Sequence, residues 1–147
     1  MECERIVIDG KMLALILRHD FDQDGIHFFT PSDFSQQLAY MKRPKDYVID
    51  PHVHNPVARN IEWTQEVLLI KKGKVRVDFY DDKRVYLESR LLVKGDVILL
   101  AQGGHGFTML EESEIIEIKQ GPYAGEQDKT RFKGVPEGDI QLEKGSE

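Results

Sequence analysis

Short β-type segments separated by turn signals follow one another along most of this sequence. The clearest turn is Asp9-Gly10, between apolar segments at 5–8 and 12–17, and Asp-Gly is among the strongest short signals for a β-hairpin. Further segments are predicted at 26–29, 47–54, 66–70, 74–80, 83–87, 89–92, 96–101, 107–110 and 115–119. Many short strands at this spacing predict an all-β fold, in which the strands form a double sheet such as a jelly-roll barrel.

One segment has helical spacing. Phe34, Leu38 and Met41 recur at intervals close to a helical turn, Ser32 is a suitable N-cap, and Pro44 would end the helix. We therefore predict a helix over residues 33–42, and an all-β fold with an N-terminal strand/helix extension.

The 147 residues suit one domain, for which we predict three parts. Residues 1–46 form N-terminal strands and the helix, packed on the barrel. Residues 47–123 form the barrel core, and residues 124–147 form a polar C-terminal tail. From residue 136 the tail is rich in Glu and Gly, and we expect it to be mobile.

Composition excludes several classes of protein. Twenty Lys and Arg against 26 Asp and Glu give a net charge of −6 without a basic block, which argues against nucleic-acid binding. No apolar run approaches the ~18–20 residues that span a bilayer, and Glu2 and Glu4 are wrong for a secretory signal, so we expect a cytoplasmic protein without a membrane partner. Cys3 is the single cysteine, so any metal site must use imidazole and carboxylate ligands.

Histidines form the most informative pattern. His52 and His54 are two residues apart in a predicted strand, so both can point at one metal ion. Downstream, Glu66 opens the next predicted strand, and His105 lies in a glycine-rich run. As alternatives to metal binding, Glu66 could be a surface carboxylate, and His105 could be a loop residue held by the surrounding glycine backbone.

Two histidines on one strand, a glutamate on the next and a third histidine two hairpins later resemble the cupin superfamily. Its motifs are G-x5-HxH-x3-4-E-x6-G and G-x5-PxG-x2-H-x3-N. The resemblance covers residues 47–119, and the spacing matches over 66–73 and 95–101. It implies a cupin jelly-roll β-barrel and one divalent metal ion (Fe, Mn, Ni or Zn). The ligands it implies are His52, His54, Glu66 and His105.

The sequence departs from the cupin pattern in four places, one of which is that Ala101 replaces the proline of the second motif. Eleven residues separate His54 from Glu66, where the family has three or four, and this spacer contains Glu62 as an alternative carboxylate ligand. His105 comes one residue early, and Met109 occupies the position of the usual asparagine.

Other polar or aromatic side chains could orient a small ligand at the barrel mouth. These candidates are Tyr47, Arg59, Glu62, Tyr80, Lys119 and Tyr123. A packing or solvent-facing role is the alternative for most of them. On the last predicted strand, Glu117 and Lys119 share one face and Ile116 and Ile118 share the other, and the pattern leaves open which face is interior.

The resemblance implies a metal-binding cupin that acts on a small polar molecule, such as a sugar or sugar nucleotide, like small cupins associated with surface-polysaccharide biosynthesis. No catalytic residue is assigned. The alternatives are a non-catalytic ligand-binding cupin module and a metal-free sugar isomerase or epimerase in which a histidine is the base. We expect a homodimer, because exposed strand edges of a jelly roll commonly need cover.

Overall fold

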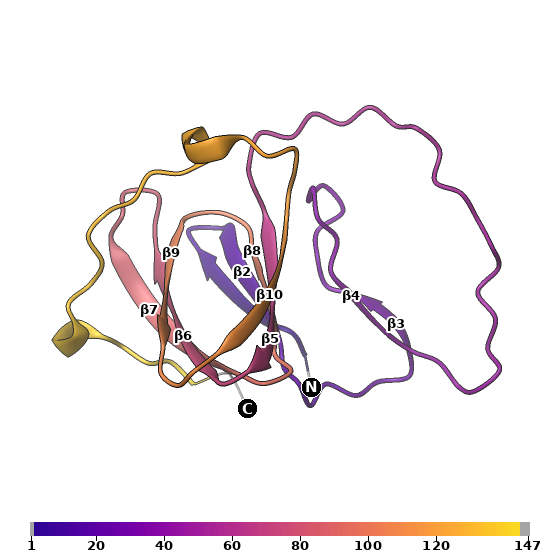
Figure 1. The fold of residues 1–147 in the computed structure, drawn as a ribbon, viewed down its shortest axis with the longest axis horizontal. Coiled ribbons are helices and arrows are strands. Elements are labelled where there is room, and N and C mark those ends of the chain that lie inside the picture. Colours follow the sequence, from indigo (N-terminus) through magenta and orange to yellow (C-terminus); the bar gives the residue numbers. More distant parts are fainter. Residues whose placement is uncertain (1, 145–147) are drawn as a thin grey trace.

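The computed structural model describes residues 2–144, in which the regular secondary structure is β-strand apart from two short 3-10 turns (Figure 1). The strands are β1 (Glu4–Ile8), β2 (Lys11–Leu17), β3 (Gly25–Phe28), β4 (Ala39–Lys42), β5 (Glu66–Lys72), β6 (Lys74–Tyr80), β7 (Tyr86–Val93), β8 (Val97–Leu100), β9 (Gly104–Met109) and β10 (Glu114–Lys119). Two short 3-10 turns follow, η1 (Gly125–Asp128) and η2 (Glu137–Asp139). The prediction of an all-β fold is confirmed. In this part of the chain, no helix has the length and apolar character needed to cross a membrane.

Two antiparallel sheets enclose the main hydrophobic core. One has five strands in the order β1-β2-β8-β5-β10, and the other has three in the order β7-β6-β9. Buried side chains from both sheets meet between them, including Leu68 of β5, Ile98 of β8, Phe79 of β6 and Leu92 of β7. Burial of each such side chain contributes roughly 1.5–3 kcal/mol. Contacts between the inner faces therefore hold the sheets together. Polar side chains that point inward at the strand ends differ from this apolar core and are candidates for a functional site.

A second cluster covers the outer face of the five-stranded sheet. Leu15 and Leu99 are fully buried there beside Cys3, and Phe34 and Leu38 from the segment before β4 pack against them. This explains why the end of β2 is buried on both faces. Burial raises the pKa of the Cys3 thiol to about 11, so the one cysteine is a core residue without thiolate character.

The helix predicted over residues 33–42 is wrong. Strand β4 occupies the second half of this range and pairs with β3, with Ile26 opposite Met41 and His27 opposite Tyr40. Phe34 and Leu38 instead lie in an irregular segment, and both side chains contact the sheet beneath it. Cross-strand pairing and this packing together outweigh local helix propensity.

The strand predicted at 47–54 is also not formed. Residues 43–64, which we call the arm, leave β4, run out away from both sheets and return to β5 (Figure 1). Every residue of the arm is exposed. Pro51 and Pro56 lack the N–H that a central strand needs, and no described strand lies beside the segment.

The predicted turn at Asp9-Gly10 is confirmed, and the predicted separation of the segments at 83–87 and 89–92 is not. The β1–β2 hairpin turns at Asp9 and Gly10, whose φ values of 50° and 74° suit a turn with both central residues left-handed. A turn over residues 81–85 precedes β7, which begins at Tyr86 and continues without a break to Val93, so the end of the predicted segment at 83–87 and the segment at 89–92 form one strand.

The C-terminal segment is held against the three-stranded sheet as far as residue 144. Arg76, on the outer face of β6, forms a 2.7 Å ion pair with Glu137 and a 2.8 Å pair with Asp78. Ser89 of β7 forms a parallel bridge with Leu142. The mobility expected from residue 136 stays a prediction, and residues 145–147 lie outside the described part.

Candidate functional site

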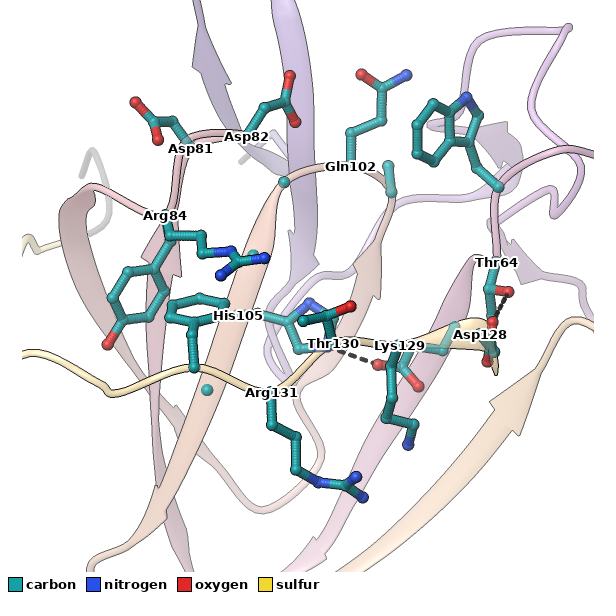
Figure 2. Close-up of a pocket in the computed structure, with 18 of the residues that line it drawn as sticks. Thr64, Asp81, Asp82, Arg84, Gln102, His105, Asp128, Lys129, Thr130 and Arg131 are labelled. Atoms are coloured by element: carbon teal, nitrogen blue, oxygen red, sulfur yellow. Dashed lines mark hydrogen bonds and ion pairs between the residues drawn. The ribbon is translucent and has the colours of Figure 1, made fainter. Parts of the chain in front are cut away.

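A pocket of about 590 Å³ opens at one end of the space between the two sheets (Figure 2). Its lining includes Glu66 at the start of β5, His105 on β9 and Lys119 at the end of β10. The segment at 128–134 crosses in front of the strands and supplies the remaining wall (Figure 2).

Strand alternation points Glu66 and His105 into this pocket. Glu66 shares a face of β5 with the core residues Leu68 and Ile70. His105 lies opposite the core residue Phe79 in the ladder between β6 and β9. The apolar pattern that builds the core therefore also places these two polar side chains at its end.

Glu66 and His105 contact each other directly. His105 Nε2 lies 2.7 Å from Glu66 Oε1, and the two side chains are 30% and 16% exposed. This hydrogen bond, more than any other cause, lowers the pKa of Glu66 to about 2, although burial acts in the opposite direction. The pair is thus an ionised carboxylate that fixes the orientation of an imidazole ring.

Strand β10 contributes two more polar groups on the same side. In its ladder with β5, Lys119 lies opposite Glu66 and Glu117 lies opposite Leu68, so both face inward. A hydrogen bond with Glu66 raises the pKa of Glu117. Two neighbouring carboxyl groups with pKa values moved in opposite directions are a frequent feature of acid–base sites. The period-two pattern contained this signal, but it did not say which face was interior.

Lys119 is also part of a second polar contact that joins three segments. Its Nζ lies 3.3 Å from Asp128 Oδ2, and Thr64 Oγ1 donates to Asp128 Oδ1 at 2.6 Å. The bond to Asp128 raises the pKa of Lys119, which keeps the ammonium charged. The end of the arm, β10 and η1 are thereby tied together beside the pocket.

Aromatic contacts hold the closing segment in place. Phe132 packs edge-on against Tyr80 with ring centroids 5.0 Å apart, and the Arg84 guanidinium lies 5.7 Å from the Phe132 ring centroid. A Cβ on Gly104 would lie 3.0 Å from Phe132 Cζ, so a glycine there lets the ring approach the strand. Val135 N donates to Tyr80 Oη at 2.9 Å.

This closing segment contains residues that the sequence analysis missed. Lys129, Arg131 and Phe132 line the pocket, together with Arg84 from the turn before β7 (Figure 2). Lys129, Arg131 and Phe132 lie in the polar region for which the sequence predicts a tail. Only long-range packing brings them to the strand ends.

The predicted site residues fall into separate groups. Glu66, His105, Tyr80 and Lys119 line the pocket together. The remaining candidates except one lie on the exposed arm, outside the pocket lining: Tyr47, His52, His54, Arg59 and Glu62. Tyr123 is 89% exposed and lines a smaller neighbouring cavity of about 180 Å³.

The four predicted metal ligands form two pairs. His52 and His54 lie side by side on the arm with ring centroids 5.3 Å apart, and Glu66 and His105 meet in the pocket. Within residues 2–144, no group of three or more His, Cys, Asp or Glu side chains converges as a metal site would require. One imidazole and one carboxylate suit first-row ions chemically but leave a coordination shell incomplete. The four-ligand metal site stays a prediction.

Comparison with known proteins adds no relative. No family model, curated protein or solved structure matches this chain. The candidate function therefore rests on the geometry of the pocket.

Proposed function

We propose that this chain is a small cupin-like jelly-roll enzyme that transfers protons on a small polar molecule, with sugars and sugar nucleotides as the substrate class. The observation that carries the proposal is the 2.7 Å contact between His105 Nε2 and Glu66 Oε1 inside a pocket. The two antiparallel sheets around one core are consistent with a jelly roll.

His105 would be the proton-transfer group. An ionised Glu66 can only accept a hydrogen bond, so the neutral imidazole carries its proton on Nε2 and leaves Nδ1 as the acceptor. His105 can then take a proton from a carbon next to a substrate carbonyl. Glu66 stabilises the imidazolium that results, because the two opposite charges are in contact. Return of the proton by His105 to the neighbouring carbon gives isomerisation, whereas protonation of the same carbon on its opposite face by a second donor gives epimerisation.

Lys119 and the cationic rim would bind the polar parts of the substrate. The Lys119 ammonium lies on the same face as Glu66 and can stabilise negative charge on an enolate oxygen. Arg84, Lys129 and Arg131 also line the pocket, where they suit a phosphate or diphosphate group. A volume of about 590 Å³ is typical of pockets that hold small ligands.

The titratable groups in the pocket favour an enzyme over a non-catalytic binding module. A binding site for a neutral ligand would be lined mainly by apolar side chains with few polar groups. Here an imidazole, carboxylates and cations share one lining. A metal-binding cupin is the second candidate, because Glu66 and His105 are two of the ligands that the sequence predicts.

Exchange of substrate protons with solvent tests the proposal. The protein is incubated in D₂O with nucleoside diphosphate sugars, their keto derivatives and free hexoses, and deuterium at carbon is followed by NMR. We expect incorporation with wild type, and a loss of about 100-fold or more with His105→Asn and Glu66→Gln. His27→Asn is the matched control, since His27 lies on the β3–β4 hairpin against Phe21. Incorporation that persists in His105→Asn would contradict the assignment.

A further inference from the structure

The arm exposes many apolar side chains. Val48, Val53 and Trp63 are 72%, 84% and 65% exposed. The arm also exposes Tyr47, Ile49, Val57 and Ile61. Flexible linkers are rich in Gly and Ser, and soluble monomers rarely leave so much apolar surface together in water. The composition of the arm is that of a segment that packs against a surface.

Polar contacts of the arm are almost all local. Tyr47 N donates to Pro44 O, His52 Nδ1 lies 2.9 Å from Asp50 O, and Arg59 Nη1 lies 3.5 Å from Val57 O. Among the described residues, the side-chain hydrogen bond that leaves the arm comes from Thr64, at its end. The rest of the arm therefore extends away from its own sheets (Figure 1).

A surface of the same kind lies on the outer side of β10. Ile116 and Ile118 point away from the core and are 47% and 58% exposed. In the ladder they lie opposite Leu69 and Val67 of β5, which share this outer face. β10 ends the five-stranded sheet, and its second edge pairs with no strand in the described part of the chain. Such an edge can accept an extended segment by strand addition.

We infer that the arm packs on the outer face and free edge of β10 in a second copy of this chain, and that two copies exchange arms across a two-fold axis. The same chain carries both an unpartnered apolar arm and an unpartnered apolar strand. A two-fold pair covers both features in both copies at once, because each copy donates an arm and accepts one. A different protein would have to cover the two features separately.

Exchange would also fix one wall of the pocket. Trp63 and Thr64, at the end of the arm, line the pocket beside Glu66. Packing of the arm on the partner therefore limits the motion of this wall. The inference does not rest on the proton-transfer chemistry, and its test needs no substrate.

The oligomeric state of an arm variant provides the first test. We expect wild type to sediment at twice the 17.0 kDa chain mass, and Val48→Asp/Ile49→Asp to dissociate with a constant about 100-fold higher or more, because two carboxylates would enter an apolar contact. The control is Val7→Asp/Val85→Asp, which adds the same charge at residues 48% and 56% exposed. Both arm residues are exposed in the single chain, so the variant should keep its circular dichroism spectrum. A monomeric wild type, or a dimeric arm variant, would overturn the inference.

Mixing two variants distinguishes exchange from packing of the arm on its own chain. Ile116→Asp/Ile118→Asp removes the acceptor surface and should also be monomeric. Mixed with the arm variant, it can still donate an intact arm to an intact acceptor. We expect the mixture to form a dimer at a concentration at which neither variant dimerises alone. If the arm packs on its own β10, or if the copies associate through other surfaces, mixing restores nothing and exchange is wrong.

Discussion

Replacement of Glu66 by glutamine should change how the stability of the protein depends on pH. In the folded chain the hydrogen bond from His105 holds the pKa of Glu66 at about 2, against an ordinary value of 4.5. A carboxyl group whose pKa is lower in the folded state stabilises that state above its ordinary pKa, and this contribution is lost as pH falls toward the folded value. Glutamine cannot ionise, so Glu66→Gln lacks the contribution at every pH.

The magnitude follows from the two pKa values. Between pH 4.5 and pH 3 the unfolded carboxylate takes up its proton while the folded one remains ionised. Each pH unit in this interval costs about 1.36 kcal/mol, so the contribution of Glu66 falls by about 2 kcal/mol from pH 6 to pH 3. The raised pKa of Glu117 opposes this change, because it disfavours the folded state while that carboxyl is ionised. The figure is therefore an upper bound for the pair.

Urea unfolding at pH 6, 5, 4 and 3 measures the effect. We expect the free energy of unfolding of wild type to exceed that of Glu66→Gln at pH 6, and this difference to shrink by up to about 2 kcal/mol at pH 3. Glu111→Gln is the control, since Glu111 lies on the surface between β9 and β10, and its difference from wild type should stay nearly constant. A constant difference for Glu66→Gln as well would refute the contact between Glu66 and His105.

Three further predictions concern the buried network, the core and the metal. Asp96 is fully buried, and its carboxylate lies 2.9 Å from Arg18 Nη1 and 2.9 Å from Val93 N. Asp96→Ala should therefore lower the free energy of urea unfolding by about 3–5 kcal/mol. Glu112→Ala, in the exposed pair with Lys72, is the control and should change it by less than about 1 kcal/mol. Phe79→Ala removes a ring that is 1% exposed between the sheets and should cost about 3–5 kcal/mol in the same assay; a loss below 1 kcal/mol would show that the core is not packed as described. If the four-ligand metal site forms, elemental analysis should find stoichiometric metal in wild type and none in either His52→Ala or His105→Ala, and wild type free of metal after growth in supplemented medium would exclude it.

Two residues of the pocket, Glu66 on β5 and His105 on β9, were predicted through their resemblance to the cupin motifs. Strand alternation adds that Glu66 shares a face of its strand with Leu68 and Ile70. His105 was found from its spacing to other histidines and from the glycines around it. Both predictions rested on the spacing of the cupin motifs, and the structure brings the two side chains within 2.7 Å.

The errors came from segments whose partners lie elsewhere in the chain. Phe34 and Leu38 have helical spacing, but contact with the sheet and the pairing of β4 with β3 decide their conformation. Residues 47–54 have the composition of a strand, yet no strand within residues 2–144 lies beside them. Arg131 and Phe132 belong to a polar segment without periodicity, so nothing local indicated that they close a pocket.

The sequence by itself determined the fold class, the turn at Asp9-Gly10 and which residues of each regular strand share a face, because these depend on residues two apart or on turn residues that need a left-handed backbone. Only the tertiary structure decided which side of β10 is interior, which polar groups meet, and where the arm lies. Those outcomes depend on the order of strands in the sheets and on contacts between distant segments. The alternation of residues along β10 is compatible with either face being interior, and the face is decided only when the sheet packs against another sheet. Here packing against the three-stranded sheet places Glu117 and Lys119 on the inner face and leaves Ile116 and Ile118 on the outer face.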